Sequence, residues 1–119
     1  MAHTRAKELL KRAEDAEGDQ RADLYKEANA QVEHALELYP EDDYGWWMLA
    51  RIHLLQGERD AAAEAAQRAL IENPSWRRLP ESTRASLGVA PELITELLEI
   101  DSFRRVWESL APETSAVAQ

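Results

Sequence analysis

The apolar and polar positions along the first 74 residues alternate with a helical period. Apolar side chains recur three and four residues apart, which places them on one face of a helix. Glycine and proline divide this pattern into segments, because both residues interrupt helices. The pattern predicts four helices: residues 4–17, residues 21–39, a third from Asp42 or Asp43 to about Gln56, and residues 59–72.

The third predicted helix is the most apolar segment of the chain. Its apolar residues lie nearly all round the helix, which predicts contacts with neighbours on two sides. They are Trp46, Trp47, Leu49, Ala50, Ile52, Leu54 and Leu55. An aspartate at 42 or 43 is expected to cap its start, and Gly57 is expected to end it.

The pattern changes after Pro74. We expect an irregular stretch to Pro80, a short helix that Gly88 ends, and a helix that begins at Pro91. A last helix is expected from Asp101 or Ser102. Residues 111–119 are small and polar, and we expect them to be disordered.

The sequence also carries an internal period of 34 residues. Five pairs of similar positions are separated by this interval, each pair with one structural role. The pairs are Pro40 and Pro74, Ala35 and Ala69, Leu36 and Leu70, Ala28 and Ala62, and Ala16 and Ala50. A fixed period of this length is typical of stacked helical hairpins.

The stretch from Asp43 to Pro74 resembles a tetratricopeptide repeat, a family with the pattern W-x2-L-G-x2-Y, then A-x3-F, then P. The matching positions are Trp46, Leu49, Ala50, His53, Gly57, Ala62, Ala66, Ala69 and Pro74. Three of them depart from the pattern: Ala50 replaces Gly, His53 replaces Tyr and Ala66 replaces Phe. Small residues at 50 and 62 allow two antiparallel helices to approach closely.

This resemblance implies an all-α fold of antiparallel helical hairpins stacked as a short superhelix. We expect one domain over residues 1–110, with a divergent hairpin at 4–40, the repeat hairpin at 42–74 and capping helices at 80–110. The first copy matches in its second half only. Its glycine is displaced by about five residues, which predicts an insertion at the start of its second helix.

The family usually binds a peptide or a partner helix on the concave face, along the first helix of each hairpin. That face of the third helix would carry Tyr44, Trp47, Arg51 and Leu55, and these are the predicted partner-binding residues. Aromatic and arginine side chains provide large contact areas and directed hydrogen bonds. A different outcome is equally open, in which the C-terminal helices pack into the groove and bury this strip.

Charge and composition narrow the range of partners. The formal net charge is −9, which repels phosphate backbones and anionic membranes, so we expect neither nucleic acid nor membrane as a partner. There is no cysteine, no apolar run long enough to span a membrane and no signal-peptide pattern. A cytoplasmic location is the expectation.

The sequence contains no recognised catalytic or metal-binding motif. The three histidines, His3, His34 and His53, lack metal-ligand spacing, and neither a nucleophile triad nor a phosphate-binding loop occurs. We therefore expect no enzyme activity, no cofactor and no metal. A core position is the more usual role for both tryptophans outside the repeat, Trp76 and Trp107. Trp76 is the better surface candidate of the two, because it lies in a non-periodic stretch between Pro74 and two arginines.

Three functional hypotheses follow. The first is a scaffold or adaptor module that binds another protein or a peptide in the concave groove. The second is a self-associating structural protein in which hairpin ends stack between chains, and it allows a weak homo-oligomer. The third is an enzyme or metal protein whose site forms only in three dimensions, which a deep pocket of convergent ionisable groups would reveal.

Overall fold

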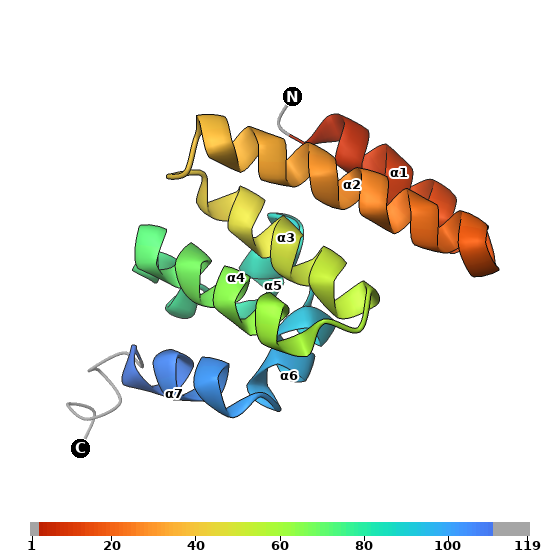
Figure 1. Ribbon diagram of the computed structural model, residues 1–119. Coiled ribbons are helices and arrows are strands. Elements are labelled where there is room, and N and C mark those ends of the chain that lie inside the picture. The colour runs from red at the N-terminus through yellow and green to blue at the C-terminus, as the bar shows by residue number, and fades with distance from the viewer. Residues whose placement is uncertain (1–2, 111–119) are drawn as a thin grey trace, which may run out of the picture.

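The computed structural model describes residues 3–110, and every regular element in that range is a helix (Figure 1). The elements are α1 (Thr4–Glu14), α2 (Gly18–Leu38), α3 (Asp43–Leu55), α4 (Arg59–Glu72), the 3₁₀-helix η1 (Pro74–Arg77), α5 (Glu81–Ser86), α6 (Pro91–Leu98) and α7 (Asp101–Ser109). The expected all-α fold is confirmed. The tail at 111–119, which we expected to be disordered, lies outside the described residues.

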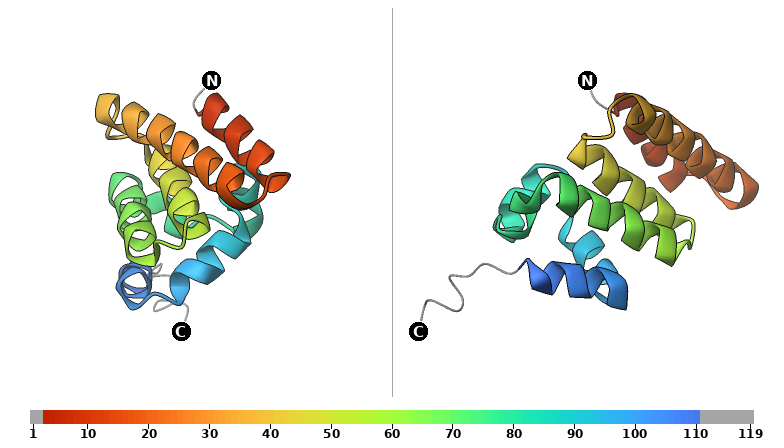
Figure 2. Two further views of the ribbon diagram at one scale, coloured as in Figure 1. Left: turned by 45° about the vertical axis from the view of Figure 1, so that its right-hand side comes forward. Right: turned by 60° about the vertical axis from the view of Figure 1, so that its left-hand side comes forward.

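Consecutive helices pack as antiparallel hairpins, α1 with α2 and α3 with α4, and α3 joins the two hairpins by packing against α2 (Figures 1 and 2). Alanines make these contacts close, since Ala28, Ala50, Ala62 and Ala66 are fully buried. Larger apolar side chains fill the space beside them. Each of those that is fully buried contributes about 1.5–3 kcal/mol by removal from water.

The 34-residue period is visible in the two hairpins. The second helices end at Leu38 and Glu72, one period apart, but α2 has 21 residues and α4 has 14. The additional residues of α2 lie at its start and amount to about two turns. The insertion expected at the start of the second helix is therefore present.

Local signals explain where α3 begins and ends. Asp42 caps the helix, because its Oδ1 accepts a hydrogen bond from the backbone N–H of Gly45 at 3.2 Å. At the other end, Gly57 adopts a φ of +80°, which a glycine tolerates. There the N–H of Glu58 donates to the carbonyl of His53, which is a Schellman motif, so Gly57 ends α3 as expected.

Two boundaries differ from the prediction. The first helix ends at Glu14 and the second begins at Gly18, so Gly18 starts a helix instead of stopping one. The guanidinium of Arg21 donates to the carbonyls of Ala13 and Ala16, which satisfies the end of α1 before the glycine is reached.

The stretch after Pro74, expected to be irregular, forms η1, because the side chain of Asn73 caps it at Ser75.

The C-terminal helices lie against the second hairpin, where α6 and α7 pack on α4. Helix α1 lies at the opposite end of the molecule (Figure 2). An aromatic cluster of Trp47, Trp76, Phe103 and Trp107 joins them to it, with ring centroids 5.7–6.3 Å apart. Trp76, the better surface candidate of the two tryptophans outside the repeat, is only 6% exposed, so it takes the core position that is more usual for a tryptophan. Its indole contacts Asp43 and Trp47 of α3, because η1 places the ring against that helix.

Among the described residues, no helix combines the length and the apolar character needed to cross a bilayer.

Candidate functional site

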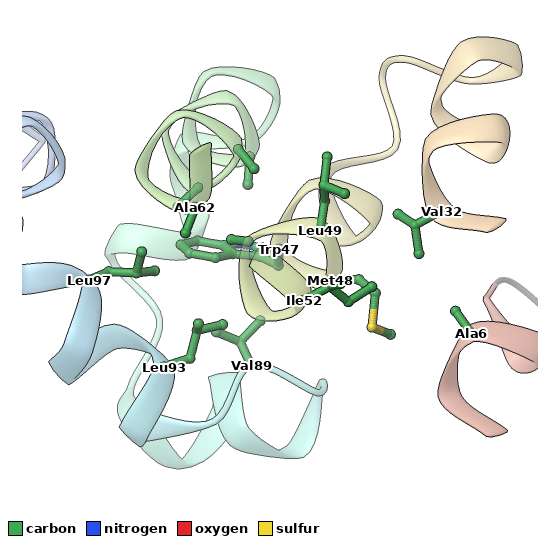
Figure 3. Close-up of a cluster of buried hydrophobic side chains, with 14 of the residues drawn as sticks. Ala6, Val32, Trp47, Met48, Leu49, Ile52, Ala62, Val89, Leu93 and Leu97 are labelled. Carbon is green, nitrogen blue, oxygen red and sulfur yellow. The ribbon is translucent and has the colours of Figure 1, made fainter. Parts of the chain in front are cut away.

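The predicted strip of Tyr44, Trp47, Arg51 and Leu55 is not one continuous open surface. Trp47 is 1% exposed and belongs to the core. Its ring meets those of Trp76 and Phe103 edge-on, and Figure 3 shows it pointing toward Ala62 and Leu97. This placement corrects the expectation that Trp47 lines an open groove. The physical reason is that the C-terminal helices need an apolar surface on α3–α4, and Trp47 provides it.

Tyr44, at the start of α3, is partly buried. Its ring packs beside the imidazole of His3, with 6.0 Å between ring centroids, and the Nζ of Lys7 lies 5.1 Å from the ring centre. The backbone of Gly88 lies directly against the phenol, since a Cβ there would be 2.7 Å from the Tyr44 Oη. The C-terminal helices therefore cover the strip at Trp47, and His3, Lys7 and Gly88 together cover part of Tyr44.

The other half of the strip remains open. Arg51 is exposed and Leu55 is 45% exposed. They border a hollow of about 360 Å³ between the end of α3 and α6, which we call the α3–α6 hollow. Its lining consists of Arg51, Leu54, Leu55, Gly88, Ala90, Glu92, Leu93 and Glu96. A volume of this size lies in the range of small-ligand and side-chain pockets.

A second hollow, of about 380 Å³, adjoins the first on the other side of Leu55 and is called the α2–α3 hollow. Its lining consists of Gly18, Arg21, Ala22, Tyr25, Lys26, Leu55, Gln56 and Glu58. The Oε1 atom of Gln56 is buried there without a hydrogen-bond partner among the described residues.

Leu55 thus forms a ridge shared by both hollows, and together they make a groove across the C-terminal end of α3. The sequence prediction identified Arg51 and Leu55 but missed Glu92, Leu93 and Glu96. The signal available for them was the amphipathic pattern of the helix after Pro91. It shows which residues share a face but not which element that face meets.

A third hollow, of about 370 Å³, lies on the outer side between α3 and α4 and includes Trp46, His53, Arg68 and Ile71. Most of its groups already have partners. The guanidinium of Arg68 stacks 5.0 Å from the Trp46 ring and donates to Glu72, and the Nδ1 of His53 lies 2.9 Å from Glu58 Oε1. The ring of Trp46 is partly buried against the core at this hollow.

The ionisable groups with shifted pKa values serve the structure. Burial raises the pKa of Asp43, but hydrogen bonds from Trp76 and Asn73 outweigh it and leave that pKa below its usual value. Burial, with a smaller effect of Arg77, lowers the pKa of Arg84, whose guanidinium packs on Trp107. Neither Asp43 nor Arg84 lines the α3–α6 or the α2–α3 hollow. The described residues contain no group of three or more His, Asp or Glu side chains placed to hold a metal ion.

The fold and the groove define a class: an all-α stack of helical hairpins with a partly apolar groove at the end of one helix. No protein-family model matches the chain, and the comparisons with curated proteins and with solved structures give no match either. The resemblance to the tetratricopeptide family therefore stays a prediction from the repeat residues.

Proposed function

We propose that this chain is a protein-interaction module of the tetratricopeptide-like kind, and that it binds a peptide or a partner helix in the groove across the end of α3. The observation that carries the proposal is the exposure of Leu55 between two adjoining hollows. Concave surfaces lined largely by apolar side chains are the usual form of a binding site, and Leu55 is shared by two of them.

The walls of the groove are held by the core, which favours binding. Leu93 and Leu97 bury one face of α6, and the Schellman motif at Gly57 fixes the end of α3. A groove that is formed before binding needs little ordering when a partner arrives, so more of the contact energy appears as affinity.

A second candidate is self-association, which an apolar patch at another edge favours. Leu38 and Tyr39 are 61% and 64% exposed and line a hollow of about 290 Å³ with Arg5 and His34. Stacking of chains through the end formed by α1 is not favoured, because the exposed residues of α1 are all polar. Sedimentation of the chain and of Leu38→Ser with Tyr39→Ser tests this candidate: a dimer that the double variant abolishes supports it.

The groove is tested by selection of peptides from a displayed random library with the parent chain as bait. Affinities of the enriched peptides are then measured for the parent, for Leu55→Ser and for the matched control Leu87→Ser, whose leucine is 53% exposed but lines neither hollow. We expect Leu55→Ser to weaken binding about tenfold or more, as loss of a central apolar contact does, and Leu87→Ser to leave it unchanged. The proposal fails if no peptide is enriched, or if the enriched peptides bind Leu55→Ser as well as the parent.

A further inference from the structure

The two walls of the α3–α6 hollow carry different charges. Glu92 and Glu96 lie four residues apart on α6, so both carboxylates are on one face about one turn apart. Arg51 lies across the hollow on α3. All three side chains are exposed.

The carboxylates of Glu92 and Glu96 also form no ion pair with the described residues. Among the described residues no ion pair involves Glu92, Glu96 or Arg51, whereas Glu99, the residue that follows α6, lies 3.9 Å from the guanidinium of Arg59. The α6 wall therefore presents two carboxylates without a cation of their own. Between the two walls lie the apolar side chains of Leu54, Leu55 and Leu93.

We infer that the partner is a basic amphipathic segment of another protein. The inference rests on the groove function proposed above and adds the chemistry of the ligand. An apolar side chain seats against Leu55 and Leu93, while lysine or arginine residues on one flank face Glu92 and Glu96. An acidic segment would meet these two carboxylates and the net charge of −9, and both would oppose its approach.

Arg51 makes the recognition directional. A cation on the α3 flank of the segment would meet this guanidinium, so the basic residues belong on the α6 flank alone. The preferred ligand accordingly has an apolar residue with basic residues three or four positions away, as one side of an amphipathic helix provides.

The test uses the peptides enriched from the displayed random library. We expect lysine and arginine to be over-represented three or four positions from an apolar residue. Binding of such peptides to the parent chain, to Glu92→Gln with Glu96→Gln, and to the control Glu33→Gln with Glu37→Gln is then measured. The control removes the same charge at the same spacing from α2, on residues that line neither hollow.

The α6 variant should weaken binding about fivefold at low salt, the sum expected of two partly exposed ion pairs, and the α2 control should change it less than twofold. Raising the salt concentration should reduce the difference between the variants, because added ions screen these pairs. The inference is overturned if the enriched peptides are neutral or acidic, or if the α6 variant binds basic peptides like the parent. If either of these outcomes occurs and Leu55→Ser still loses binding, the groove is retained as the binding site and only its basic ligand is rejected. An absence of peptides that depend on Leu55 would reject both.

Discussion

The indole nitrogen of Trp76 donates a hydrogen bond of 2.6 Å to the Oδ2 of Asp43, which ties η1 to the first turn of α3. The same carboxylate oxygen accepts from the side-chain amide of Asn73 at 2.8 Å. A charged acceptor makes both bonds stronger than a neutral one would. One carboxylate oxygen therefore binds both Asn73 and Trp76, at the point where the chain leaves α4 and enters the C-terminal segment.

Replacement of Asp43 by Asn should destabilise the fold in a pH-dependent way. Because the folded-state pKa of Asp43 is lowered from 3.8, its stabilisation is present above that value and is lost as the pH falls through the folded pKa. We expect Asp43→Asn to reduce the free energy of unfolding by about 1–3 kcal/mol at neutral pH, through weaker hydrogen bonds. Urea titrations at several pH values measure this cost. A cost that stays constant into strong acid would contradict the assignment, and the exposed Asp23→Asn is the control.

Trp47 and Arg51 lie one turn apart on α3, but their replacement by alanine should change the free energy of unfolding by very different amounts. Trp47→Ala empties a core site and should lower the free energy of unfolding by about 3–5 kcal/mol. Arg51→Ala removes an exposed side chain and should change it by no more than about 0.5 kcal/mol. Denaturant unfolding of both variants gives the comparison. Equal stability of the two would mean that Trp47 is not covered by the C-terminal helices.

These two residues also illustrate how far the sequence could predict the site. The 34-residue period and the glycine and proline signals can be read within the sequence of the two hairpins themselves. They therefore located the helices of both hairpins to within a few residues. The packing of α5, α6 and α7 lies outside the period and depends on contacts between distant parts of the chain. Trp47 was therefore predicted on an open face, although Val89 and Leu97 lie beside it in Figure 3.

The acidic wall of the groove was missed for the same reason. The helical pattern after Pro91 shows that Leu93 and Leu97 share a buried face, but it carries no information about which helix they meet. The position of α6 is set by the turn at Gly88, where the N–H of Val89 donates to the carbonyl of Arg84. Sequence alone suggested that the helix ends there but not the direction in which the chain leaves.

Gly88 should tolerate substitution less well than Gly57. Both have positive φ, +106° and +80°, so an alanine at either position is strained by about 1–2 kcal/mol. A Cβ at Gly88 would also lie 2.7–3.0 Å from atoms of the Tyr44 ring, whereas nothing lies within 4 Å of one at Gly57. We expect Gly88→Ala to cost about 1 kcal/mol more than Gly57→Ala in thermal or urea unfolding. Equal costs would show that the Tyr44 ring moves aside freely.

Asp42 connects the start of α1 to the start of α3, and its removal should affect both. One oxygen caps α3 at Gly45, and the other lies 2.7 Å from the Nε2 of His3, whose side chain is only 3% exposed. We expect Asp42→Ala to cost about 2 kcal/mol, from the lost cap and the lost partner of His3, and His3→Ala to cost about 1 kcal/mol.

The double variant separates the two contributions. If the two residues act through their shared contact, Asp42→Ala with His3→Ala should cost less than the sum of the single variants, because the contact can be lost only once. Hydrogen exchange adds a local readout: amides in the first turn of α1 should exchange faster in both single variants, while those in the first turn of α3 should do so only when Asp42 is replaced. Additive costs together with unchanged exchange in α1 would show that His3 does not anchor the first helix.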